Sequence, residues 1–418
     1  MIRSSKHSYH YLNERKKLSL NCFVDEYRRV GQLIINEIWE NGYEEFIPKL
    51  DKLDTPRYYD YKRFNFETTL SARALSSLVT QLSSVIGAAT EKRRRCLWVI
   101  EQLKLEGKSY KKLLKKTNKN YKLVKPNFSN SGAELSSKCA DVQTTNGKFI
   151  KFLRLKSLGK NFGVIKIPIL GNKIQNKWEN AGTLLNSFLI SKENVQLRYN
   201  IEKTGKRIGE TVVGIDQGMK TVATFSNGEK TPDKDIHGHS LESIIDLMVK
   251  KRKGSKAFMK LQTLRKNFIN WSLNQINFSE FKEVRLEKIW NIGYKTRKSR
   301  KMSHWTNTLI RDKIKKSAQE AEVPLIEQDS SYRSQRCSSC GSVRKANRKT
   351  KEYKCKHCGF ICDADLNASL NHVVDLPEIH WSLRGKKYNL GNGFYWLTTG
   401  LFTFDGQELR VSDFQEKE

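Results

Sequence analysis

The chain has 418 residues and a formal net charge of +33, from 77 Lys and Arg against 44 Asp and Glu. Self-repulsion of this size disfavours a compact chain, so the charge indicates a polyanionic partner. With 38% hydrophobic and 10% aromatic residues, the sequence is not a disordered basic tail, and its length allows two or three domains. It contains no apolar run near the ~20 residues that cross a bilayer, and no strongly amphipathic basic stretch that would indicate a membrane surface.

Residues 21–125 are predicted to be mainly helical, because apolar side chains recur there at helical spacing. Basic clusters decorate this region, and tyrosines interleave with them. Each cluster alone fits a solvated helix face, but with the charge of the whole chain we interpret them as a phosphate-binding surface. The clusters comprise Lys92, Arg93, Arg94, Arg95, Lys111, Lys112, Lys115, Lys116, Lys119, Lys122 and Lys125, with Tyr110 and Tyr121 between them.

From Pro126 the pattern changes to short β-type segments separated by Gly and Asn, which is typical of a small barrel or sandwich. The predicted strands are residues 149–155, 162–170, 187–190 and 195–201. A third region opens at Thr211, where an apolar strand ends in Asp216 and residues 221–225 form the second strand of a hairpin. Strands and helices then alternate, with helices expected at about 241–277 and 305–321, which predicts an α/β core.

Two Cys-x-x-Cys knuckles stand fourteen residues apart, and an acidic helix start follows them closely. Four thiolates at this spacing suit tetrahedral zinc, and such a site can contribute roughly 10 kcal/mol or more to folding. We therefore predict a structural zinc ribbon in a reducing compartment, and regard His357 as a bystander. The predicted ligands are Cys337, Cys340, Cys355 and Cys358.

Asp216, Glu287 and Asp365 lie in three separate segments, two strands and the first turn of a helix. Singly, each has an ordinary structural explanation, and Asp363 is the expected N-cap of the last helix. Together they offer the oxygen ligands that Mg²⁺ or Mn²⁺ prefers. A pair of such ions can activate water for phosphodiester cleavage.

These segments resemble the split RuvC-type nuclease of the transposon-encoded TnpB proteins and of the compact type V CRISPR effectors, above all the miniature type V-F group. The matching motifs are Gly-Ile-Asp-Gln-Gly at 214–218, Val-Arg-Leu-Glu-Lys at 284–288, the ribbon entry at 330–341 and Asp-Ala-Asp-Leu-Asn-Ala-Ser at 363–369. The resemblance covers residues 206–376, about two-fifths of the chain. It implies that Asp216, Glu287 and Asp365 are the catalytic acids, with Asp365 preferred over Asp363.

The resemblance also implies a multidomain α+β architecture with a helical recognition lobe, a β-barrel wedge domain and an RNase H-like (RuvC) α/β core that carries the inserted zinc ribbon. The expected domains are residues 1–20 and 126–205 (wedge barrel), 21–125 (helical recognition), 206–326 (RuvC motifs I and II), 327–361 (zinc ribbon, target nucleic-acid-binding), 362–376 (motif III helix) and 377–418 (a C-terminal extension). In the extension, residues 393–406 are predicted to form a β-hairpin, and Trp381, Tyr395 and Trp396 are expected to pack rather than to stack on bases.

The implied function is an RNA-guided DNA endonuclease of antiviral defence, located in the prokaryotic cytoplasm at the nucleoid. One RuvC site with two Mg²⁺ or Mn²⁺ ions would cut, and the partners would be a guide RNA and double- and single-stranded target DNA. An asymmetric homodimer on one RNA is also implied, although the sequence itself does not show it. Two alternatives stay open, namely a guided DNA-binding repressor without cleavage and a guide-free zinc-ribbon protein that binds nucleic acid.

Overall fold

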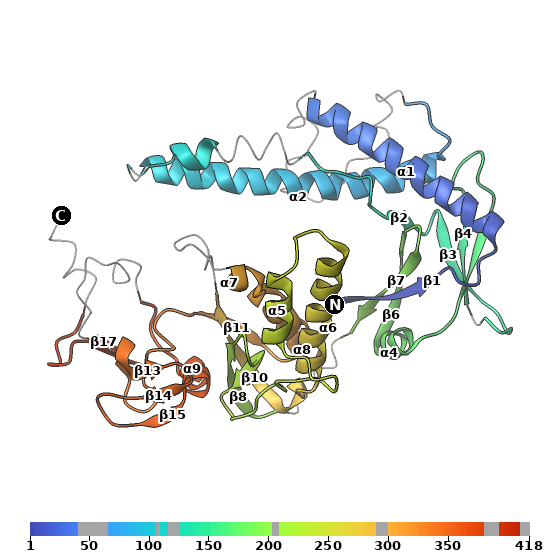
Figure 1. The fold of residues 1–418 in the computed structure, drawn as a ribbon. Helices are drawn as coiled ribbons and strands as arrows, with labels where there is room; N and C mark the ends of the chain where they lie inside the picture. The colour runs from blue at the N-terminus through green and yellow to red at the C-terminus, as the bar shows by residue number, and fades with distance from the viewer. Residues whose placement is uncertain are drawn as a thin grey trace. The chain divides into compact units, whose positions relative to one another are not determined.

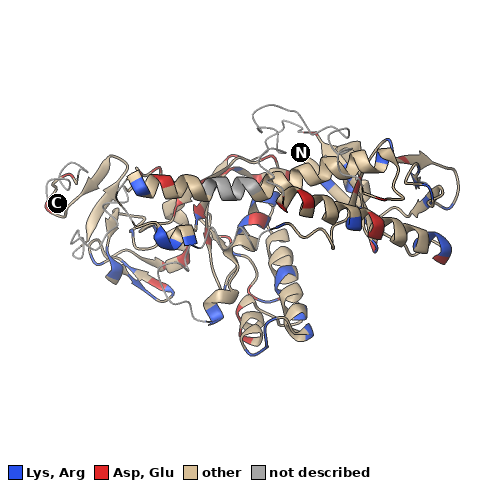
Figure 2. Cartoon of the chain, turned by 90° about the horizontal axis from the view of Figure 1, so that it is seen from above, with Lys and Arg blue, Asp and Glu red and all other residues tan. Residues whose placement is uncertain are grey.

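A computed structural model describes residues 1–40, 66–105, 107, 109–115, 125–149, 151–202, 209–289, 300–379 and 393–409, without the side chains of 90–95. The chain divides into two compact units, Met1–Lys203 and Thr204–Glu418 (Figure 1). Lys and Arg occur along the described segments of both units, interspersed with Asp and Glu (Figure 2). Within these ranges, no helix has the length and apolar content that a membrane span requires.

The first unit combines two long helices with two antiparallel sheets. Its elements are β1 (Ile2–Ser8), α1 (Glu14–Glu40), α2 (Ala72–Leu105), β2 (Ala133–Ser136), β3 (Ala140–Thr144), β4 (Lys151–Leu155), β5 (Ile165–Ile169), α4 (Lys173–Ala181), β6 (Gly182–Ile190) and β7 (Asn194–Ile201). Strand β1 pairs with β7, so a segment that precedes the two long helices in the sequence and one that follows them share one sheet. A single apolar core joins α1 and α2 to both sheets.

Two expectations for this unit were wrong. The described strands form two open sheets, of order β1-β7-β6-β2 and β3-β4-β5, and no pairing between the sheets closes a barrel. Helix α1 also begins seven residues before the expected boundary at residue 21, because the side chain of Asn13 accepts a hydrogen bond from the Lys16 N–H and caps the helix there (2.9 Å). The buried side chain of Leu20 extends the apolar face of the helix back toward this cap.

Part of the expected basic surface lies outside the described residues. These positions include the side chains of Lys92–Arg95 in α2 and the residues Lys116, Lys119, Tyr121 and Lys122. Within the description, Lys111, Lys112 and Lys115 are exposed. The ammonium group of Lys104 lies 5.1 Å from the ring centroid of Tyr110.

The second unit is built on a four-stranded sheet of order β11-β10-β8-β9. Strand β10 pairs in parallel with both β8 and β11, and β9 pairs antiparallel with β8, which confirms the predicted hairpin. In sequence order, the strands of this sheet and the helices between them are β8 (Thr211–Gln217), β9 (Ala223–Phe225), α5 (Leu241–Val249), α6 (Lys256–Asn274), β10 (Phe281–Lys288), α7 (Arg300–His304), α8 (Asn307–Glu320) and β11 (Leu325–Asp329).

Helices cover both faces of this sheet. Apolar residues of α5, α6 and α8 share one core with Val213 and Ile215 of β8 and with Val284 and Leu286 of β10. Helix α9 (Ala364–Val373) packs against β8 from the other side. The long helix expected at 241–277 is two helices, because the chain turns between them at Gly254, where φ is +82°.

The rest of the second unit consists of two three-stranded sheets. The first contains β13 (Arg348–Lys349), β14 (Glu352–Lys354) and β15 (Ile361–Asp363), and leads directly into α9. The second contains β12 (Ser342–Val343), β16 (Phe394–Leu397) and β17 (Gly400–Phe402). The predicted C-terminal hairpin is therefore present as β16 and β17, and it pairs with a strand of the ribbon.

Candidate metal-dependent active site

Strand alternation brings Asp216 and Glu287 together. In β8 and β10 the residues that precede them, Ile215 and Leu286, are paired partners and both point into the core. Because successive side chains alternate between faces, the two acids lie side by side on the opposite face of the sheet. The backbone N–H of Gln217 donates a hydrogen bond to Glu287 Oε1 (3.2 Å), which fixes this carboxylate at the end of its strand.

Helix α9 brings Asp365 to the same face. Asp363 caps the helix by accepting hydrogen bonds from the backbone N–H groups of Asp365 (2.9 Å) and Leu366 (3.0 Å), as predicted. Its carboxylate is therefore engaged at the helix start, and Asp365 is free to turn toward β8. The helix approaches so closely that a Cβ atom at Gly214 would lie 2.1 Å from the Ser369 carbonyl oxygen, so only glycine fits at that position.

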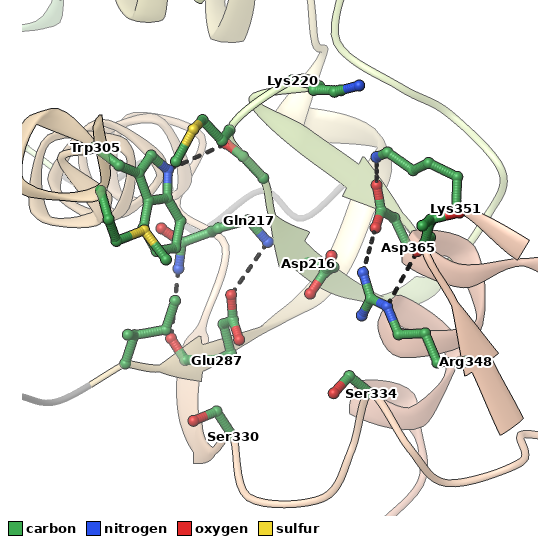
Figure 3. A pocket seen from close by; sticks show the side chains of 15 residues that line it. Asp216, Gln217, Lys220, Glu287, Trp305, Ser330, Ser334, Arg348, Lys351 and Asp365 are labelled. Atoms are coloured by element: carbon green, nitrogen blue, oxygen red, sulfur yellow. Dashed lines mark hydrogen bonds and ion pairs between the residues drawn. The ribbon is translucent and has the colours of Figure 1, made fainter. Parts of the chain in front are cut away.

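All three acids line one pocket of about 580 Å³. Figure 3 shows Asp216 between Glu287 on one side and Asp365 on the other. Asp365 is 5% exposed and is held by two cations of the ribbon. The Arg348 guanidinium donates to Asp365 Oδ1 (3.0 Å), and the Lys351 ammonium donates to Oδ2.

Lys220, Arg348 and Lys351 line the pocket together with the three acids, and both Arg348 and Lys351 pair with Asp365. Burial, and then repulsion from Glu287 and Asp365, raises the pKa of Asp216 well above its ordinary value, although Arg348 and Lys351 oppose this shift. Burial raises the pKa of Glu287 to about 7, against the hydrogen bond from Gln217 and the charge of Arg348. Such a site gains stability from additional positive charge.

Carboxylate oxygens are the donors that Mg²⁺ and Mn²⁺ take up, so the residues of this pocket fit these ions. Among the described residues, however, only the four cysteines place all their ligand atoms within 4.8 Å of one another. The oxygens of Asp365 instead contact Arg348 and Lys351. The two basic side chains therefore pair with the same carboxylate that a metal ion would need as a ligand.

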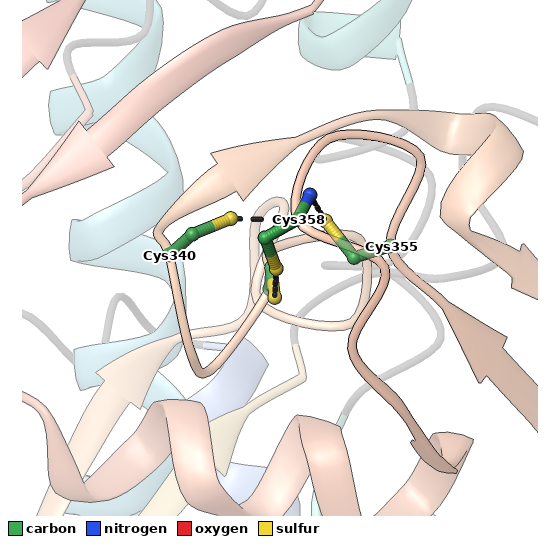
Figure 4. A group of neighbouring side chains, drawn as sticks. Cys340, Cys355 and Cys358 are labelled. Carbon is green, nitrogen blue, oxygen red and sulfur yellow. Dashed lines mark hydrogen bonds between the residues drawn. The ribbon is translucent and has the colours of Figure 1, made fainter.

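The four cysteine sulfurs form the predicted cluster (Figure 4). The Sγ atoms of Cys337 and Cys358, and those of Cys340 and Cys355, are 3.7 Å apart. Sulfurs placed about 2.3 Å from a tetrahedral zinc ion would be roughly 3.8 Å apart, so the arrangement fits zinc. Although burial opposes it, hydrogen bonds from Ser342 and from backbone N–H groups lower the pKa of Cys355 to about 6, which favours the thiolate.

His357 is directed away from the cluster. Its ring pairs with the Tyr395 hydroxyl (Nε2 to Oη 2.6 Å), and its backbone N–H donates to the Cys355 sulfur. In the extension, Trp396 is 2% exposed and packs with Val343 and Phe394, as expected for a packing role. Trp381 lies outside the described residues.

Buried polar contacts connect the ribbon to α9. The Arg336 guanidinium donates to the side-chain oxygen of Asn371 in α9 and to the backbone oxygen of Trp396 in β16. The Asn371 amide in turn donates to the backbone oxygens of Arg333 and Arg336. The same network therefore fixes the helix that carries Asp365 and the hairpin that follows it.

Sequence reasoning did not place Arg348, Lys351 or Trp305 at the site. Arg348 and Lys351 lie between the two Cys-x-x-Cys knuckles, and Trp305 begins the helix expected at 305–321. Arg348 and Lys351 are close to Asp365 in the sequence, but this did not distinguish them from the other basic residues of the ribbon. Nothing local marked Trp305, which reaches the pocket through tertiary packing alone.

Comparison with known proteins finds a family that is similar to the ribbon. The family described as "Cas12f1-like, TNB domain" matches residues 309–372, which include the four cysteines and Asp365. Residues 309–372 are therefore similar to the Cas12f1-like TNB domain. The CRISPR-associated endodeoxyribonuclease Cas12f1 of Sulfoacidibacillus thermotolerans is 39% identical over 82 residues, which are 19% of this chain and 19% of that relative.

The fold of the chain extends the likeness beyond the TNB domain. A Cas12f1 chain solved in complex with sgRNA and target DNA aligns with 87% of this chain and 83% of its own length, at a TM-score of 0.52 and 15% identity. The mini-RNA-guided endonuclease CRISPR-Cas_phi3 aligns over 89% of this chain and 92% of its own, with a TM-score of 0.49 and 9% identity. The first alignment shows a shared fold of mixed α and β elements that extends beyond residues 309–372.

Proposed function

We propose that the chain is an RNA-guided DNA endonuclease with a single RuvC-type site formed by Asp216, Glu287 and Asp365. The observation that carries the proposal is the convergence of these three acids, from β8, β10 and α9, in one pocket that the segment similar to the TNB domain partly lines. The likeness to Cas12f1, an endodeoxyribonuclease, supports the class of reaction. The domains expected from the sequence are part of the proposal, with two open sheets in place of the wedge barrel.

In this mechanism the three acids would hold two divalent ions, and the chemistry that these ions would supply is the activation of water and the stabilisation of the leaving oxygen. The chain itself supplies the positions of the ligands. Gln217 orients Glu287 through its backbone N–H, and the Asp363 cap sets the first turn of α9. Arg348 and Lys351 bring positive charge to the Asp365 side of the pocket, where they can contact the phosphates of a bound strand.

The proposed partners are a guide RNA and target DNA, as in the solved Cas12f1 complex with sgRNA and target DNA. The net charge of +33 supports a polyanionic partner of this kind. Base pairing with the guide would then select the target sequence. A homodimer on one RNA and a location in the prokaryotic cytoplasm at the nucleoid belong to the same proposal.

The test begins with the RNA that copurifies with the full chain. Its sequence defines a matching DNA target, which is incubated with the complex in Mg²⁺ and, in parallel, in Mg²⁺-free buffer. We expect cleavage only with Mg²⁺ and only of the matching target. Binding of the target without cleavage would favour the guided repressor, and the absence of a discrete RNA would favour the guide-free binding protein.

A further inference from the structure

The candidate pocket has two chemically different sides. Arg348 and Lys351 line the side of Asp365, whereas Met219, Met302 and Trp305 line another part of the wall. Figure 3 shows Trp305 across the carboxylates from the two cations. Ions and a phosphate group use the charged side. Neither ions nor a phosphate group would bind to the apolar part of the wall.

Trp305 is held firmly at the edge of the acids. Its indole N–H donates a hydrogen bond to the backbone oxygen of Gly218 (3.2 Å), two residues beyond Asp216. The ring is partly buried because it packs against the apolar core of the second unit, and the same residue lines the pocket. An aromatic ring fixed in this way offers a stacking surface without losing side-chain freedom on binding.

The volume of the pocket allows a larger occupant than metal ions. About 580 Å³ lies within the range of roughly 300–1,000 Å³ that is typical of small-molecule sites. An occupant with a charged group beside the acids and a flat apolar group a short distance away would complement both sides. A nucleotide has this chemistry, because its phosphate and its base are joined through one sugar.

We propose that the apolar wall of Met219, Met302 and Trp305 binds a nucleobase next to the scissile phosphate, with Trp305 as the stacking platform. The proposal rests on the proposed nuclease function and deepens it. Within a duplex, neighbouring base pairs cover both faces of each base, so only an unpaired strand can present a base to the wall. Trp305 is then a residue that selects single-stranded DNA, and it does so without preference for one base, since every base has a π-face.

The first test is a scan of the substrate that leaves the protein unaltered. Target strands with one abasic site, moved nucleotide by nucleotide past the cut position, are incubated with the full chain and its copurified RNA in Mg²⁺. Removal of the stacked base should slow cutting by about 5- to 150-fold at one flanking position, with smaller effects elsewhere. Equal cutting at every position near the cut would overturn the proposal.

Variants connect the effect to the residue. Trp305→Ala should cut intact DNA about 5- to 150-fold more slowly and should show no further loss with the sensitive abasic strand. Trp305→Phe should retain both the activity and the sensitivity. Trp271→Ala is the matched control, because Trp271 is a partly buried tryptophan of α6 that packs on the same core and does not line the pocket. Sensitivity to the abasic site that persists in Trp305→Ala would contradict the assignment.

A binding measurement separates this inference from the nuclease proposal. A single-stranded oligonucleotide containing 2-aminopurine is bound to the full chain with Ca²⁺ in place of Mg²⁺. Stacking quenches its fluorescence, so emission should be lower with the wild type and Trp305→Phe than with Trp305→Ala. If the wild type cuts no DNA but this difference is found, the nuclease proposal fails while the base site stands. Equal emission from all three proteins would refute the base site.

Discussion

At the residue scale, the candidate site is a group of three acids in which two cations of the ribbon both pair with Asp365. Burial raises the pKa values of Asp216 and Glu287, and Asp365 relies on Arg348 and Lys351. A site built only for stability would pair each buried acid with a basic residue. The raised pKa values of Asp216 and Glu287 therefore support a role in cation binding.

The raised pKa of Glu287 predicts how stability depends on pH in zinc-loaded, Mg²⁺-free protein. A carboxyl with a folded-state pKa of about 7, above its ordinary value of 4.5, stabilises the fold at low pH and loses this contribution as pH rises toward 7. We expect the free energy of unfolding to fall by at most about 3 kcal/mol between pH 5 and pH 8. Denaturant titrations at both pH values measure this change. Glu287→Gln should show a smaller fall, and an equal fall in both proteins would refute the assignment.

Removal of the two ribbon cations should affect metal binding and stability in opposite directions. In the double variant Arg348→Met, Lys351→Met, Asp365 loses both partners, so we expect the metal-free protein to be about 3 kcal/mol less stable. The freed carboxylate should bind Mn²⁺ more tightly. Calorimetric titration and denaturation measure the two quantities. Lys354→Met is the control, since Lys354 is exposed on β14 outside the pocket, and an unchanged Mn²⁺ affinity in the double variant would contradict this account.

Much of the site follows from local rules of sequence. The N-cap role of Asp363 and the zinc-ligand spacing of the four cysteines are visible in the sequence, whereas the choice of Asp365 over Asp363 came from the resemblance. Arg348, Lys351 and Trp305 could not be ranked above other basic or aromatic residues, because their roles depend on contacts between distant segments. The same limit explains why two open sheets were mistaken for a barrel, since strand patterns do not show whether edge strands pair.

At the element scale, the ribbon and the C-terminal hairpin form one structure. Strand β12 of the ribbon pairs with β16, and Arg336 connects both to α9. The sequence predicted the hairpin but gave no indication of its partner. The hairpin of β16 and β17 therefore belongs to the packing that supports Asp365.

This arrangement predicts that Trp396→Ala weakens the zinc site from a distance. The variant removes a buried tryptophan from the small core around Val343 and Phe394, which costs about 3–5 kcal/mol in comparable cases. We expect a chelator to extract zinc faster from the variant, as measured with a colorimetric zinc indicator. Trp271→Ala, in α6, should leave the extraction rate unchanged. The same rate in Trp396→Ala and the wild type would show that the hairpin does not support the ribbon.

At the scale of the whole molecule, the net charge of +33 implies binding dominated by phosphate contacts. If 6–10 phosphates are contacted, affinity for nucleic acid should fall by about 10³- to 10⁵-fold between 50 and 200 mM salt. Fluorescence anisotropy with a labelled strand measures this slope. An affinity that hardly changes with salt would indicate that the charge serves some other purpose.

The most direct test of the central claim uses Asp216→Ala in the full chain with its copurified RNA. If the three acids form the single nuclease site, this variant should bind the matching target with nearly wild-type affinity and leave both DNA strands uncut in Mg²⁺. The wild type, assayed in parallel, should cut both strands. Cleavage of either strand by Asp216→Ala at the wild-type rate would contradict the account.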